Sequence, residues 1–184
     1  MSDRMTPLAF PQMLRWIVNE DKERGSIFGI DRALRFRPRP DDPFAHEDGF
    51  GHRLATPVGP AAGPHTQLAQ NIVAAWLCGG RFIELKTVQI MDTLEIPRPC
   101  IDLADEGYNV EWSQELPLAA SRAEYVKAWV LIHLLREHLG MNDAPLGTVF
   151  NMSVGYNLEG ITSGPMTAFM NGLENAEAEI GELL

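Results

Sequence analysis

The chain of 184 residues carries 15 lysines and arginines against 25 aspartates and glutamates, and its formal net charge of −10 argues against nucleic acid as a partner. Its hydrophobic fraction of 45% suits a globular domain with one core, and no apolar run approaches the roughly 20 residues that cross a bilayer. The N-terminus does not resemble a signal peptide, and the two cysteines, Cys78 and Cys100, are too few to hold an iron–sulfur cluster, so we expect a reduced, cytoplasmic protein.

The N-terminal part is predicted to be a helix followed by an irregular surface excursion. Apolar residues recur at helical spacing within 10–23, and Gly25 ends that helix. Residues 33–52 are rich in proline, aspartate and glycine, a composition typical of a surface loop. We therefore divide the chain into residues 1–54, an N-terminal helix and Pro-rich excursion, and residues 55–184.

From residue 55 onward, strand-like and helical segments alternate. The predicted strands cover 57–61, 81–90 and 148–157, and a shorter extended segment covers 107–113. The predicted helices cover 67–78, 121–139 and 166–173, followed by an acidic, helix-prone tail. This alternation predicts a parallel sheet, in which the carboxyl ends of the strands meet at one edge. We expect the functional site at that edge.

The helix over 121–139 has the clearest signals at its two ends. Ser121 with Glu124 is the pattern of a capping box, and Gly140 closes the other end. The apolar residues predicted to face the sheet are Val126, Val130 and Leu134, and the charged residues predicted to lie in solvent are Arg122, Lys127 and Glu137.

The stretch PVGPAAGPHT, residues 57–66, joins the first predicted strand of this unit to its first helix. Prolines, glycines and alanines bury little apolar area, but they let a flat molecule lie directly against the backbone. Thr66 is predicted to cap the helix that follows. His65 is either a polar residue near a helix N-terminus or part of a site. The glycine pattern is neither a P-loop nor GxGxxG, so it does not by itself predict nucleotide binding.

Four further side chains are candidates for chemistry. Lys86 follows a predicted buried strand and either leads its ammonium group into solvent or projects into the cleft as a fixed cation. Glu84 shares the same face of that strand and could pair with it. Asn109 and Glu111 alternate on an extended segment, where they could bind the polar edge of a heterocycle or form hydrogen bonds within a loop. No histidine or cysteine spacing predicts a metal site.

Several segments together resemble a known family. PVGPAAG, FIELKT, YNVEW and FNMSVGYN resemble the first part of the flavin barrels of dihydroorotate and dihydropyrimidine dehydrogenases, and SIFGI, GGRFIELKTVQI and FNMSVGYNLEGI resemble the N-terminal region of bacterial selenate reductase subunits. The resemblance covers most of the chain, from about residue 5 to residue 171. It implies an α/β fold, the N-terminal portion only of a dihydroorotate dehydrogenase-like TIM (β/α) barrel, and an oxidoreductase component.

The resemblance also implies FMN as a cofactor. The flat object beside the small-residue stretch is then an isoalloxazine ring, lying against the backbone of Ala61, Ala62 and Gly63. Lys86, followed by Thr87, matches the family's lysine near the pyrimidine edge of the ring. A cation there would stabilise the anionic reduced flavin.

The same resemblance implies where the substrate binds and where the electrons that reduce it come from. Asn109 matches an asparagine that contacts cofactor and substrate, and Glu111 matches a glutamate that contacts the substrate, which is a heterocycle or an oxyanion. In the full-length family the electrons come from NAD(P)H through domains with FAD and iron–sulfur clusters. The resemblance matches no residue of this chain to the catalytic acid or base.

A closed barrel needs eight strands and about 250 residues, and the sequence offers three or four βα units. We therefore expect partners that supply the remaining barrel and the electron-transfer domains, in the same longer protein or in another chain, and self-association of the chain alone. The alternative is a non-catalytic interaction or structural fragment of a split or truncated barrel. A third hypothesis is a small doubly wound α/β domain with an unrelated ligand.

Overall fold

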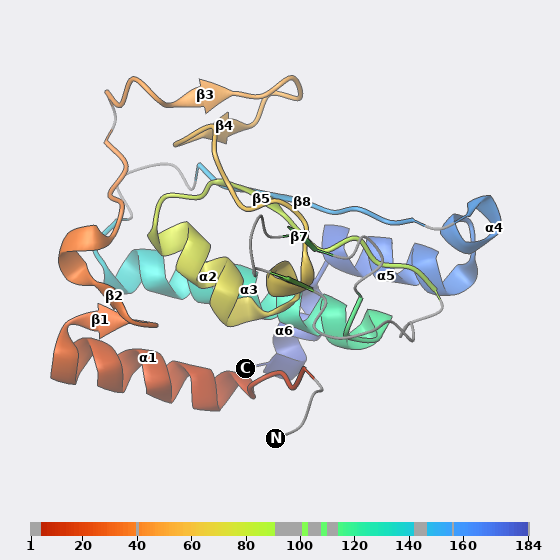
Figure 1. The fold of residues 1–184 in the computed structure, drawn as a ribbon, viewed down its shortest axis with the longest axis horizontal. Helices are drawn as coiled ribbons and strands as arrows, with labels where there is room; N and C mark the ends of the chain where they lie inside the picture. The colour runs from red at the N-terminus through yellow and green to blue at the C-terminus, as the bar shows by residue number, and fades with distance from the viewer. Residues whose placement is uncertain are drawn as a thin grey trace.

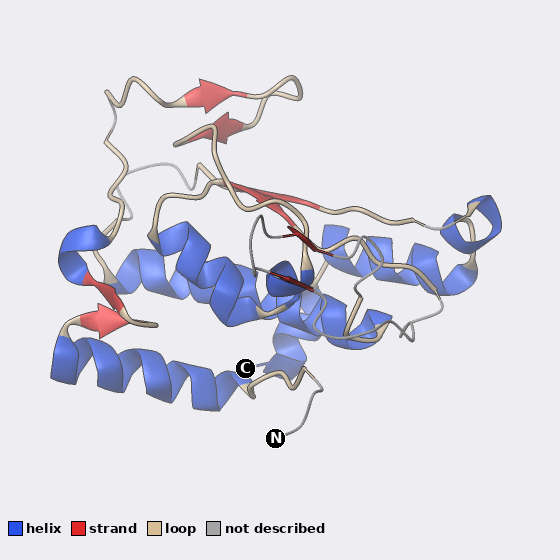
Figure 2. Cartoon of the chain, in the orientation of Figure 1, coloured by secondary structure: helices blue, strands red, loops and turns tan. Residues whose placement is uncertain are grey.

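The computed structural model describes residues 5–39, 41–90, 101–102, 108–109, 114–141, 147–155 and 157–183. Its helices are α1 (Phe10–Arg24), α2 (Ala69–Leu77), α3 (Leu118–His138), α4 (Leu158–Ile161), α5 (Gly164–Glu174) and α6 (Glu177–Leu183), with 3-10 turns η1 (Arg32–Leu34) and η2 (Pro64–Gln67). Its strands are β1 (Ser26–Ile27), β2 (Ile30–Asp31), β3 (His46–Glu47), β4 (Arg53–Leu54), β5 (Phe82–Glu84), β6 (Ile101–Asp102), β7 (Tyr108–Asn109) and β8 (Val149–Asn151). Figures 1 and 2 show this arrangement.

The central sheet is parallel, as predicted. β5 pairs with β8, with Phe82 opposite Val149 and Glu84 opposite Asn151. The pairing continues beyond the strands, where Val88 forms a parallel bridge with Val154. In Figure 1 the two strands run side by side above the helices. Parallel strands separated in sequence by helices are the arrangement of the first units of a (β/α) barrel.

The predicted strand over 57–61 is not assigned as a strand, yet it runs beside β5. The backbone N–H groups of Phe82 and Glu84 donate to the carbonyl oxygens of Val58 and Pro60, both at 3.2 Å. Prolines in the segment have no N–H to return these bonds, which leaves the ladder one-sided. A Cβ built on Gly59 would overlap the carbonyl oxygen of Phe82, so the close approach of the two segments requires glycine.

The helices and the sheet share one hydrophobic core. α2 and α3 pack against each other, and α3 also contacts α5 and α6 (Figure 1). The largest fully buried apolar side chains of this core are Met13, Ile27, Ile72, Trp76, Leu77, Ile83, Leu85, Tyr125, Leu131, Ile132 and Met166. Side chains from α1 and β1 belong to this same core, while the hairpin β3–β4 projects away from it with Phe44 and Phe50 exposed (Figure 1). The division at residue 54 stays a prediction.

The expected capping box at Ser121 is wrong. α3 begins at Leu118, directly after Pro117, so Ser121 and Glu124 lie inside the helix. A proline immediately before the helix ends the preceding extended chain and lets the helix start earlier than the capping pattern indicates. The other end is as predicted, since Gly140 has a φ of +64° and the next amide, that of Met141, donates to Arg136 O at 2.8 Å.

The face that α3 buries differs from the predicted one. Val126 is buried and Glu137 is exposed, as expected, but Leu134 is 40% exposed. Val130 is partly buried and packs against the core, as expected. The fully buried core side chains of α3 were not predicted, and they are Tyr125, Ala128, Leu131, Ile132 and Leu135. Arg122 is only partly exposed, because it forms an ion pair with Glu179 at 3.1 Å that holds α6 on α3.

Lys127 was expected in solvent and is buried instead. Its ammonium group forms an ion pair with Glu124 and donates to the carbonyl oxygen of Leu8 at 2.6 Å. The second oxygen of Glu124 accepts the N–H of Ala69, the first residue of α2, at 2.8 Å. The carboxylate thus does the capping work predicted for Thr66, whose hydroxyl bonds to the carbonyl oxygen of Gly63 at 3.0 Å inside η2.

Candidate functional site

The small-residue loop lies at the carboxyl end of β5. The backbone N–H of Ala62 donates to a carboxylate oxygen of Glu84 at 3.1 Å. Gly63 is buried and is held by the hydroxyl of Thr66, whereas Ala61 is exposed. The loop therefore presents methyl groups and backbone at the edge where the strands end.

Lys86 lies two residues beyond Glu84, the last residue of β5, and is 4% exposed, so it is not a solvated strand end. Strand alternation places both side chains on one face. The carbonyl oxygen of Lys86 accepts the hydroxyl of Tyr125 at 3.1 Å. Burial raises the pKa of the Tyr125 hydroxyl far above its ordinary value, so the hydroxyl stays a neutral donor. Thr87 follows, partly buried.

The strand ends converge as the parallel order predicts. The amide of Gly155 donates to Val88 O at 2.9 Å, and that of Val88 donates to Ser153 O at 3.2 Å. The ends of β5 and β8 and the 61–63 loop thus lie together. Asn151, which is opposite Glu84 in the β5–β8 register, is a partly buried polar residue at this edge that the sequence analysis did not single out.

The two substrate candidates are only partly placed. Asn109 belongs to β7, where it is opposite Ile101 of β6, and its side chain is not described. Glu111 lies outside the described residues. Their roles therefore stay predictions.

His65 is exposed beside the loop. Although the residue is exposed, its surroundings desolvate the ring and lower its pKa, against an opposing hydrogen bond with the backbone of Ala61, so the imidazole is predominantly neutral at neutral pH. It is available as a polar neighbour of the loop and carries no fixed charge.

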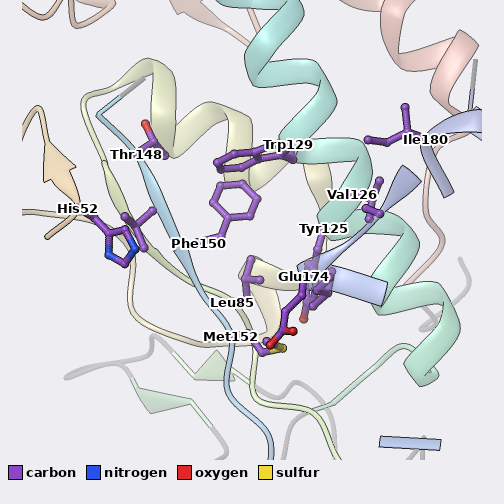
Figure 3. A pocket seen from close by; sticks show the side chains of 13 residues that line it. His52, Leu85, Tyr125, Val126, Trp129, Thr148, Phe150, Met152, Glu174 and Ile180 are labelled. Atoms are coloured by element: carbon purple, nitrogen blue, oxygen red, sulfur yellow. The ribbon is translucent and has the colours of Figure 1, made fainter. Parts of the chain in front are cut away.

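An apolar cavity of about 480 Å³ lies against β8, between that strand, α3 and the C-terminal helices (Figure 3). Its lining side chains include Trp129 and Phe150, whose rings meet edge to face at 5.0 Å, together with Met152, Val126 and Ile180. The ionisable side chains that line it are His52, Tyr125 and Glu174. In the described part of the chain no strand pairs with the far edge of β8.

Within the described residues, no group of three or more histidine, cysteine, aspartate or glutamate side chains is placed to hold a metal ion. Among the described helices, none is long and apolar enough to cross a membrane.

Comparison with known proteins gave three kinds of match. The family model for the N-terminal TIM-barrel domain of the oxidoreductase YgfK matches residues 28–181. The oxidoreductase YgfK of Escherichia coli strain K12 is 51% identical over 176 residues, which are 96% of this chain and 17% of that protein. The dihydroorotate dehydrogenase (quinone) of Rhodopseudomonas palustris strain TIE-1 is 32% identical over 122 residues, 61% of this chain and 33% of that enzyme. The chain thus spans about a sixth of the length of the YgfK relatives.

Proposed function

Because this chain belongs to the family of the N-terminal TIM-barrel domain of the oxidoreductase YgfK, with the fold of a partial TIM barrel, we propose that it is the FMN-binding part of a longer oxidoreductase. The observation that carries the proposal is the buried Lys86, which follows the carboxyl end of β5, the same end at which the exposed small-residue loop lies. The distant similarity to dihydroorotate dehydrogenases supports a flavin.

Several described residues support a flavin ring at this edge of the sheet. Ala61 and Ala62 carry only methyl groups, so a planar ring can approach the backbone, and Ala61 is exposed to receive it. Lys86 supplies the cation, with Thr87 and Asn109 as further contacts to the pyrimidine edge. Bound FMN would supply the transfer of hydride and single electrons, and a fixed positive charge favours its anionic reduced state.

The substrate we propose is a heterocycle or an oxyanion, bound by Asn109 and Glu111. Selenate is one such oxyanion, suggested by the resemblance to selenate reductase subunits. Electrons would come from NAD(P)H through FAD and iron–sulfur clusters in the remainder of the longer protein, located in the cytoplasm. The relatives' greater length supports such further domains.

The next strand of the longer protein would pair with the free edge of β8. In a strand, alternate residues direct their N–H and C=O groups to opposite sides, so Phe150 and Met152 present theirs away from β5. An incoming parallel strand would satisfy these groups and fill the cavity beside Trp129 with apolar side chains.

The test is a titration of the full-length protein, stripped of flavin, with FMN. We expect Lys86→Met to weaken binding by about one to two powers of ten, because one charge-assisted contact is lost, and to make the bound flavin harder to reduce. Lys22→Met, on the exposed face of α1, is the matched control and should bind as the wild type does. Equal affinity and equal reduction potential in the Lys86 variant and the wild type would refute the proposed site.

One observation favours the non-catalytic alternative. The N–H of Ala62 is already bound to Glu84, which leaves one fewer backbone donor for a ring. A full-length protein that is colourless and takes up no FMN would support a structural role.

A further inference from the structure

Two buried glutamine side chains form hydrogen bonds with backbone groups near the strand ends. No sequence motif identifies these glutamines. Gln67, the last residue of η2, is fully buried at 0% exposure. Its side-chain oxygen accepts the backbone N–H groups of Glu115 at 2.8 Å and Leu116 at 3.0 Å. A buried N–H must find an acceptor, so this one oxygen satisfies two otherwise costly groups.

Gln114, which is 3% exposed, uses both ends of its amide. Its oxygen accepts the N–H of Gln89 at 2.8 Å, and its nitrogen donates to the carbonyl oxygen of Leu116 at 2.9 Å. Leu116 is therefore held at its N–H by Gln67 and at its C=O by Gln114. We call the two side chains the amide clamp.

The clamp connects the two segments that form the proposed flavin site. Gln67 closes the turn that begins directly after Ala61–Gly63, and Gln89 lies three residues beyond Lys86. Residues 114–116 sit between the two and lead directly into α3. Both glutamines are neutral, so they fix the backbone without placing a charge beside the site.

We infer that Gln67 and Gln114 are positioning residues, which set the 61–63 loop and Lys86 at a fixed separation. The inference rests on the proposed function. The clamp acts through the backbone bonds of residues 89, 115 and 116. Without these bonds, the loop and the end of β5 would still be joined by Ala62 and Glu84, but the chain after Lys86 would lose its anchor to η2.

The experiment compares variants of the full-length protein by amide hydrogen exchange and by FMN titration. Gln67→Leu removes the acceptor for two amides. Gln114→Leu removes the other half of the clamp, and it provides the same test if Gln67→Leu does not fold. Gln70→Leu is the matched control, because the side-chain oxygen of Gln70 is buried without a hydrogen-bond partner in the described structure.

We expect Gln67→Leu and Gln114→Leu to raise exchange at residues 86–89 and 114–116 about tenfold and to weaken FMN binding by a similar factor, while exchange in α1 is unchanged. Gln70→Leu should stay near the wild type in FMN affinity. Faster exchange confined to residues 115 and 116, whether or not FMN is bound, would overturn the inference that the clamp connects the 61–63 loop to the chain after Lys86. Faster exchange in both segments with unchanged FMN affinity would overturn the positioning role. A wild type that binds no FMN would refute the proposed function itself, and the exchange data would then decide the coupling alone.

Discussion

Replacing Glu124 should destabilise the fold more than replacing any exposed charge of α3. The carboxylate is 1% exposed and has two partners, the ammonium group of Lys127 and the N–H of Ala69. Glu124→Ala would leave the Lys127 charge buried without its ion-pair partner, at a cost of about 3–5 kcal/mol. It would also leave the N–H of Ala69 without an acceptor, at a cost of about 1–3 kcal/mol.

Because the two losses share one side chain, they do not simply add, and we expect a decrease of at least about 4 kcal/mol in the free energy of unfolding. Many domains have a total of about 5–15 kcal/mol, so the variant would be close to unfolding at room temperature. Urea unfolding followed by tryptophan fluorescence measures the change, with Glu137→Ala on the exposed side of α3 as the control.

The double variant Glu124→Gln with Lys127→Met separates the charge from the cap. Glutamine keeps an oxygen for Ala69, and methionine removes the stranded charge, so the double variant should recover most of the lost stability. A loss below about 1 kcal/mol in Glu124→Ala would show that the carboxylate does not hold α2, α3 and the N-terminal segment together.

Gly59→Ala should lower the free energy of unfolding in urea by about 3 kcal/mol or more, because the new methyl group would overlap the carbonyl oxygen of Phe82. Gly164→Ala is the control and should change little, because open space surrounds Gly164. Equal stabilities of the two variants would contradict the packing of residues 57–61 on β5. Burial alone would raise the pKa of Asp21, but hydrogen bonds led by Arg35 at 2.7 Å lower it overall. A carboxyl group whose pKa is lowered in the folded state adds stability that is complete above its unfolded pKa and is lost as the pH falls through its folded pKa. Asp21→Asn should therefore make the free energy of unfolding less dependent on pH at acid pH. An unchanged slope at acid pH would refute this. The chain alone should associate through the free edge of β8 and bind FMN a few powers of ten more weakly than the full-length protein; a monodisperse monomer saturated at submicromolar FMN would contradict the unfinished barrel.

Sequence patterns over a few neighbouring residues were sufficient to predict the elements that depend on local interactions. The helix α1, the left-handed Gly140 at the end of α3 and the parallel order of the strands all follow from periodicity and glycine placement. The sequence left Lys86 either solvated or fixed in the cleft, and its burial beyond the end of β5 excludes the solvated alternative.

Contacts between residues distant in sequence were beyond such signals. Glu124 matched a capping pattern on its own helix, but it caps α2, because tertiary packing brings the start of that helix against α3. Lys127 looked solvated because its partners, Glu124 and the carbonyl of Leu8, meet only in the folded chain. The bonds of Gln67 join residues that are 48 and 49 positions apart, and no periodicity reports such a pairing.

The most direct test of the account is the identity of the flavin that the purified full-length protein releases on denaturation, separated by chromatography and quantified per chain. We predict FMN at about one equivalent, and its loss when Ala61 and Ala62 are both replaced by leucine, since the larger side chains would occupy the space of the ring. Release of FAD alone, or retention of FMN by the double leucine variant, would contradict the claim that this domain holds a flavin against its 61–63 loop.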